Sequence, residues 1–173
     1  MSGTHASGKS TLISDFHAAH PEYTVLGDPF DDIDSHDPSS AACFVAQLRV
    51  TVARLRESAG ERSVIFERGP LDFLAYLTAL EMLGRGDDAL LARAHELVES
   101  SMADIDLIAV VPLDPRHPID LPDDEDPELR EAMEDALLEA LDDLERAGDM
   151  PSIAMLTGSP GERLVQLEQA AAL

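Results

Sequence analysis

Two spacings of apolar residues predict the secondary structure of this chain. Short apolar runs, rich in β-branched residues, predict strands; they cover residues 23–26, 63–66, 105–113 and 152–156. Apolar residues repeating every three or four positions predict helices; these cover residues 12–20, 40–58, 70–83, 89–102, 127–146 and a last stretch from 160. Strands and helices alternate throughout, which indicates a parallel sheet with helices on both faces.

Local signals mark where several of these helices begin and end. Pro21 should stop the first helix, and Pro70 suits the first turn of another. Asp126, before Pro127, is a typical helix cap. Ser159 and Glu162 form a capping-box pattern that opens the last helix. The chain shows no internal repeat, and we interpret residues 1–173 as one domain with a proline-rich, acidic lid at about 114–127.

Charge and composition narrow the classes of partner. The formal net charge is −23, so duplex DNA and anionic membranes are not expected to bind. No apolar run reaches the length of a membrane span, and no signal peptide is evident. Cys43 is the only cysteine, which excludes an internal disulfide and fits the cytoplasm. The acidity is compatible with adaptation to high salt or with an Asp/Glu-rich genome.

The N-terminal residues contain a phosphate-binding pattern. Residues 3–10 read G-T-H-A-S-G-K-S, which matches G-x-x-x-x-G-K-[ST], the P-loop. Lys9 is the only lysine, and every other residue among the twelve Lys and Arg is arginine. Arginine's broad fork is a poor substitute for an ammonium inside a tight loop. We expect these residues to bind nucleotide: Gly3, Thr4, His5, Ala6, Ser7, Gly8, Lys9, Ser10 and Thr11.

One part of the P-loop context is absent from the sequence. A P-loop should follow a buried strand, yet only Met1 and Ser2 precede Gly3. We therefore expect a three-layer α/β/α P-loop fold with its first strand missing or truncated. Loss of a central strand would leave backbone groups of its neighbours unpaired.

Polar side chains follow the predicted strands, where ligands bind in open parallel sheets. Asp28 follows the strand 23–26, and Glu67 and Arg68 follow 63–66. Such an acid can accept a proton or hold Mg²⁺ through water, and the arginine can bind phosphate. An ion pair between Glu67 and Arg68, or a turn cap at Asp28, is the simpler alternative. Gln47 could contact a substrate amide or be satisfied within the core.

The chain resembles P-loop kinases of the nucleoside and nucleotide type, including thymidylate and ribosylnicotinamide kinases, and the AAA-like ATP-binding proteins related to them. The resemblance rests on G-T-H-A-S-G-K-S-T, E-R-G-P-L-D-F-L-A-Y-L and T-G-S-P-G-E-R, which occur in the right order over nearly the whole chain. Gly69 stands where serine is usual in that family.

The resemblance implies ATP and Mg²⁺ as cofactors and assigns roles to individual residues. Lys9, Glu67 and Arg68 would be catalytic, and Asp28, Gln47 and Arg68 would contact the acceptor. Mg²⁺ would be held by Ser10, and by Glu67 or Asp28 through water. The lid would supply Arg116 or Arg130, and the adenine would pack beside the last loop; the residues concerned in that loop are Thr157, Ser159 and Pro160.

Three functions remain open from the sequence. The first is phosphoryl transfer from ATP to a small acceptor of nucleoside or nucleotide type. The second is a nucleotide-dependent regulatory ATPase or switch that acts on a protein partner, which the acidic lid favours. The third is an inactive, truncated form. A homodimer is left open, and neither nucleic acid nor membrane is expected as a partner.

Overall fold

A computed structural model describes residues 1–33, 37, 39–114, 116, 119, 126–148 and 151–173, although not the side chains of residues 31–32. Within these ranges six α-helices follow one another along the chain: α1 (Lys9–Ala19), α2 (Ala41–Glu57), α3 (Pro70–Met82), α4 (Asp88–Ser101), α5 (Pro127–Ala147) and α6 (Pro160–Ala170). The strands are β1 (Thr24–Leu26), β2 (Val64–Phe66), β3 (Leu107–Val110) and β4 (Ser152–Met155). Two short 3₁₀ turns, η1 (Pro29–Asp32) and η2 (Met102–Asp104), complete the described elements.

The strands form two parallel pairs. β1 pairs with β2, so that Val25 lies opposite Ile65. β3 pairs with β4, so that Ile108 lies opposite Ile153. Between the two pairs lies the N-terminal residue pair Met1–Ser2, and Ser2 forms a parallel bridge with Val110. The parallel sheet predicted from the alternating elements is confirmed, with strands shorter than the apolar runs suggested.

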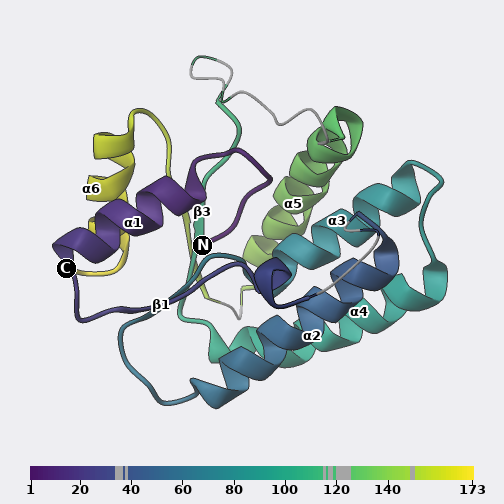
Figure 1. The fold of residues 1–173 in the computed structure, drawn as a ribbon, viewed down its shortest axis with the longest axis horizontal. Helices are drawn as coiled ribbons and strands as arrows, with labels where there is room; N and C mark the ends of the chain where they lie inside the picture. The colour runs from purple at the N-terminus through teal and green to yellow at the C-terminus, as the bar shows by residue number, and fades with distance from the viewer. Residues whose placement is uncertain (34–36, 38, 115, 117–118, 120–125, 149–150) are drawn as a thin grey trace.

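Helices cover both faces of these strands, as Figure 1 shows: α1 and α6 pack together on one side, and α2 to α5 form a bundle on the other. Each side has its own core. The larger core includes Leu48, Phe73 and Leu137, none of which exposes any side-chain surface. The smaller core lies beneath α1 and α6 and includes Phe16 and Leu156. Such burial on both faces explains why the strands read as continuous apolar runs.

Several predicted helix boundaries are confirmed by their caps. The Asp126 carboxylate accepts hydrogen bonds from the N–H groups of the first turn of α5. Ser159 and Glu162 form the predicted capping box of α6. The first helix begins at Lys9 rather than at residue 12, because Gly8 takes a left-handed conformation that starts the helix directly from the P-loop.

Most of the predicted lid lies outside the described residues. Of the residues between 114 and 127, the structure describes Asp114, Arg116, Ile119, Asp126 and Pro127. Among the described helices, none is long and apolar enough to cross a membrane.

Candidate nucleotide-binding site

The P-loop backbone takes the shape that its glycines permit. Gly3 has a φ of +141°, and a Cβ at this position would lie 2.5 Å from the Val111 carbonyl oxygen. Gly8 has a φ of +95° and caps the N-terminus of α1. Side chains other than hydrogen are therefore strained at both positions. The loop thus passes close to β3 and leads directly into a helix N-terminus, which is a favourable arrangement for an anion.

Lys9 lies inside the loop rather than outside it. Its Nζ donates to the Thr4 carbonyl oxygen at 2.6 Å and to Ser7 Oγ at 3.4 Å, and only 6% of the residue is exposed. Burial, together with the nearby positive charge of Arg68, lowers the pKa of Lys9 from 10.5 to about 7. An anionic ligand in the loop would favour the charged ammonium again.

Ser10 and Glu67 meet at the opening of the loop. Ser10, at the start of α1, donates from Oγ to Glu67 Oε1 at 2.5 Å. Glu67 follows β2, where its N–H donates to the Leu26 carbonyl oxygen and extends the ladder with β1. The end of β2 thus places a carboxylate beside the hydroxyl that the P-loop pattern assigns to Mg²⁺.

Arg68, which follows β2, contacts both the residue after β1 and the P-loop. Its Nε donates to Asp28 Oδ2 at 2.5 Å, and one of its terminal nitrogens lies 3.1 Å from His5 Nε2. Burial alone would raise the pKa of Asp28, but the Arg68 guanidinium and the Phe30 N–H hold it below its usual value. Burial and the Arg68 charge lower the pKa of His5 to about 3, so its ring is neutral near pH 7. Asp28 also caps η1, as the simpler alternative predicted, and its role toward a ligand stays a prediction.

A cavity of about 260 Å³ brings most of the predicted residues together. It is lined by the loop from His5 to Thr11, by the strand-end residues Asp28, Glu67 and Arg68, and by Ile119. A larger cavity of about 440 Å³ lies between β2 and β3 and shares Arg68 with this one. We place the nucleotide site in the smaller cavity because it contains the P-loop and its carboxylates.

Other predicted site residues lie outside this cavity. Gln47 is 3% exposed and donates to Cys43 Sγ at 3.3 Å within α2. Arg116 is 77% exposed and pairs with Asp114 instead of the P-loop. The residues predicted to lie beside adenine occupy the turn before α6, where Ser159 caps the helix; these are Thr157, Ser159 and Pro160. Their roles toward a ligand stay predictions.

Three further side chains support the loop. Arg130 of α5, which the resemblance places in the lid, donates to the carbonyl oxygens of His5 and Ala6 at 3.0 and 3.2 Å. Arg163 of α6 donates to the Ser7 carbonyl oxygen at 2.9 Å, and sequence reasoning gave it no role. Together with Lys9 and Arg68, these two arginines bring positive charge to the loop in a chain with a formal net charge of −23.

Asp72 is the third of these supporting residues, and sequence reasoning also missed it. It is fully buried in the first turn of α3. Its carboxylate accepts from the Gly3 N–H at 2.8 Å, the Ser2 hydroxyl at 2.9 Å and the Gly69 N–H at 2.8 Å. The available signal was an acid three residues into a helix that begins at Pro70, the position that bonds back to its own helix cap. Asp72 therefore joins the start of the P-loop to the loop that carries Glu67 and Arg68.

The residues at the loop opening fit a magnesium ion. Mg²⁺ prefers oxygen ligands and is commonly held by one or two carboxylates together with nucleotide phosphates and water. The Ser10 hydroxyl and the Glu67 carboxylate supply such oxygens side by side. No cluster of three or more His, Cys, Asp or Glu side chains suited to a metal occurs among the residues with described positions. One hydroxyl and one carboxylate are protein donors of the kind that suit Mg²⁺ bound together with a nucleotide.

Comparison with known proteins agrees with this geometry. The sequence profile of a family described as "AAA domain" matches residues 1–148, and the chain belongs to that family. No curated protein matches the sequence.

The fold is that of a P-loop kinase. A structure of deoxyadenosine kinase from M. mycoides with bound dATP is similar to this chain at a TM-score of 0.75 and 12% identity, covering 99% of this chain and 97% of that one. The same enzyme with the products dCMP and a flexible dCDP gives a TM-score of 0.73 at the same identity and coverage. With bound dCTP it gives 0.65, again at 12% identity and with 99% and 97% of the two chains covered.

Proposed function

We propose that this protein binds ATP–Mg²⁺ in its P-loop and transfers the terminal phosphoryl group to a hydroxyl or phosphate of a small acceptor of nucleoside or nucleotide type. One observation carries the proposal: Asp28, Glu67 and Arg68 converge with the P-loop on a single cavity. The deoxyadenosine kinase structures show that this fold can hold nucleotides, which supports the assignment.

Each residue has a distinct task in this proposal. The P-loop N–H groups and the N-terminus of α1 hold the phosphates, and Lys9 supplies a positive charge to the transferring group. Arg68, fixed by Asp28 and His5, binds phosphate oxygens on the acceptor side. Mg²⁺, held at Ser10 and Glu67, would neutralise charge on the phosphates.

Glu67 and Asp28 differ as candidate bases. Asp28 is paired with Arg68 and its pKa is below its usual value, so it is a poor proton acceptor and acts by orienting Arg68. Glu67 uses Oε1 for Ser10, which leaves Oε2 for the acceptor hydroxyl. We assign the proton-accepting role to Glu67, because it has this second oxygen whereas the Asp28 carboxylate is paired with Arg68.

The test is ADP production measured against a panel of nucleosides, nucleoside monophosphates and nicotinamide riboside. Acceptor-dependent ADP formation that is lost in Lys9→Ala would support the proposal. ADP formation at the same slow rate with and without every acceptor would contradict it.

A second function, a nucleotide-dependent switch, is favoured by one observation. Arg116 is directed to Asp114 at the surface and not to the P-loop, so the described part of the lid contributes no charge to the site. A switch would bind a protein partner with different affinity in the presence and absence of ATP. Equal partner affinity under both conditions would exclude this alternative.

A further inference from the structure

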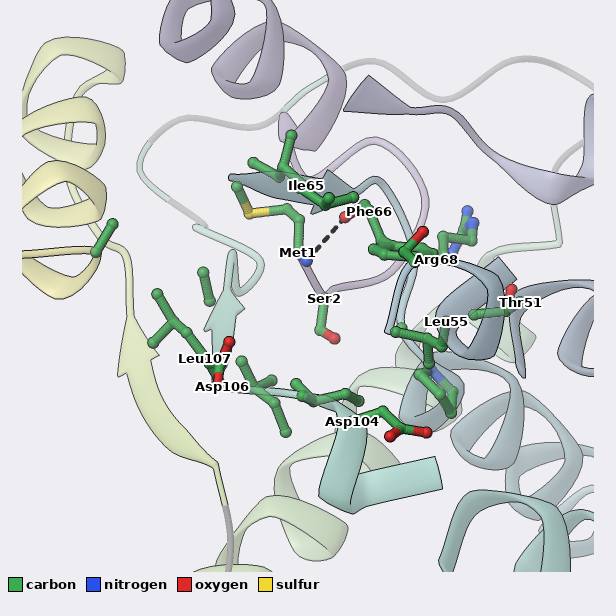
Figure 2. A pocket seen from close by; sticks show the side chains of 18 of the residues that line it. Met1, Ser2, Thr51, Leu55, Ile65, Phe66, Arg68, Asp104, Asp106 and Leu107 are labelled. Atoms are coloured by element: carbon green, nitrogen blue, oxygen red, sulfur yellow. Dashed lines mark hydrogen bonds between the residues drawn. The ribbon is translucent and has the colours of Figure 1, made fainter. Parts of the chain in front are cut away.

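The cavity between β2 and β3 separates the two halves of the sheet. It measures about 440 Å³, and Figure 2 shows Met1 and Ser2 lying between Phe66 of β2 and Leu107 of β3. In the described part of the chain, β2 pairs only with β1 and β3 only with β4. The cavity therefore lies along the inner edges of two strands.

One end of this cavity contains a short length of strand. The Met1 nitrogen donates to the Phe66 carbonyl oxygen at 2.9 Å, toward β2. Toward β3, the Ser2 N–H donates to the Ala109 carbonyl oxygen at 2.7 Å, and the Val111 N–H donates to the Ser2 carbonyl oxygen at 2.9 Å. Successive residues thus bond alternately to the two neighbours, which is the pattern of a strand paired on both sides in parallel.

The same alternation identifies the backbone groups that face the cavity. The backbone groups of Ser63 and Glu67 bond to β1. Val64 and Phe66 alternate with them, so their backbone N–H and C=O groups face the cavity. Asp106 and Val110 bond to β4, so Leu107 and Ala109 face it from the other side. Beyond the bonds made by Met1 and Ser2, six groups remain to be paired: the N–H of Val64, Phe66, Leu107 and Ala109, and the C=O of Val64 and Leu107.

Apolar side chains line the cavity from both of its faces, together with polar ones such as Thr51, Ser58 and Arg68. Leu55, Leu71 and Ile105 line it from the larger helical bundle, and Tyr23 and Ala171 line it from the side of α1 and α6. A strand within such a cavity would need apolar residues at successive positions, not at alternate ones.

The mouth of the cavity is acidic. It lies at the N-terminal ends of β2 and β3, where the exposed acids Glu61, Asp104 and Asp106 outnumber Arg62. A basic residue would be favoured there.

We propose that this cavity is the acceptor site for one extended peptide strand, parallel to β2 and β3 and joined to the Met1 nitrogen. About four apolar residues are required, because the N–H groups of Val64, Phe66, Leu107 and Ala109 each need a carbonyl oxygen from a different residue before Met1. The residue bonded to Met1 would pair with Leu107 and Ala109, the one before it would pair with Val64 and Phe66, and the next two would pair with the remaining N–H groups. A basic residue would then lie at the acidic mouth.

The test compares this chain with versions that carry a short N-terminal extension. The first adds an arginine followed by four valine or isoleucine residues. One matched control replaces those four with glycine and serine, and another places proline at the position next to Met1, where it cannot donate to β3. Melting temperature and amide hydrogen exchange are measured in each version.

The apolar extension should raise the melting temperature by roughly 5–10 °C, given the area of apolar surface it buries. Exchange at the amides of Val64, Phe66, Leu107 and Ala109 should slow by about tenfold or more. Neither control should reproduce these effects. Replacing Asp104 and Asp106 by lysine should reduce the gain in melting temperature, because the arginine would then face like charges.

Three results would overturn the proposal. The apolar and glycine–serine extensions could give the same melting temperature and the same exchange at those four amides. The free peptide could protect them when the joined extension does not, which would make the occupant a separate molecule. The chain without an extension could form a dimer in sedimentation equilibrium with the same amides protected, which would make the occupant a second copy. All these readouts are independent of ATP turnover, so they can fail separately from the proposed kinase activity.

Discussion

Lys9 should make the stability of this protein depend on pH in a way that a single substitution removes. Its folded pKa of about 7 is lower than the ordinary 10.5 because the ammonium is buried in the P-loop beside Arg68. The unfolded chain therefore binds more protons than the folded protein between pH 7 and pH 10.5, and the free energy of unfolding rises with pH across this window.

The size of the effect follows from the two pKa values. At pH 7 the burial of Lys9 costs about 4 kcal/mol of unfolding free energy, and at pH 9.5 it costs about 1 kcal/mol. The protein should thus gain about 3 kcal/mol from Lys9 between these two pH values. Lys9→Met has a similar length and no titrating group, so it should lack this gain and be the more stable protein at pH 7.

Urea denaturation of both proteins at pH 7 and pH 9.5 measures this difference. The Met1 amino group, whose pKa is lowered to about 6, also titrates in this range. Burial is the main cause of that shift and Lys9 a smaller one, so subtracting the two pH dependences removes most of the Met1 contribution. A difference of less than about 1 kcal/mol between the two pH dependences would refute the reasoning. It would mean that the ammonium is solvated in the folded protein.

Three other substitutions separate the roles of individual residues. Glu67→Gln should lower kcat by roughly 10²-fold or more, because the amide cannot accept a proton; an unchanged kcat would exclude Glu67 as the base. Asp72→Asn should lower the free energy of unfolding by about 2–4 kcal/mol. The amide keeps one acceptor oxygen, but its NH₂ group replaces the other and would face a donor, either the Gly3 N–H or the Ser2 hydroxyl and Gly69 N–H. The exposed Asp88→Asn serves as its control and should change stability by less than about 0.5 kcal/mol. Ser159→Ala should cost about 1 kcal/mol of stability through loss of the α6 cap, and any separate loss of ATP affinity would show a nucleotide contact.

Local sequence signals account for much of the fold and part of the site. The P-loop, the cap of α5 and the capping box of α6 each depend on residues within a few positions of one another, so the sequence alone could indicate them. The convergence of Asp28, Glu67 and Arg68 followed from the rule that strand ends in a parallel sheet share one edge.

Contacts between distant segments were not predictable in this way. Arg130 and Arg163 reach the P-loop from helices more than a hundred residues later in the chain, and nothing in their local sequence indicates the direction of their side chains. Gln47 shares a helical face with apolar residues, a pattern compatible with a ligand or with the core, and the structure places it in the core beside Cys43. Such choices depend on how the helices pack.

Titration of ATP–Mg²⁺ into the protein by calorimetry is the most direct test of the nucleotide site, with Lys9→Ala as the comparison. The account predicts saturable binding at one site that is abolished by Lys9→Ala. Since binding restores the charge on Lys9, it should also be accompanied by proton uptake at pH 8, seen as a dependence of the measured heat on the buffer. Equal binding by both proteins, or none by either, would contradict the assignment of the P-loop as the nucleotide site.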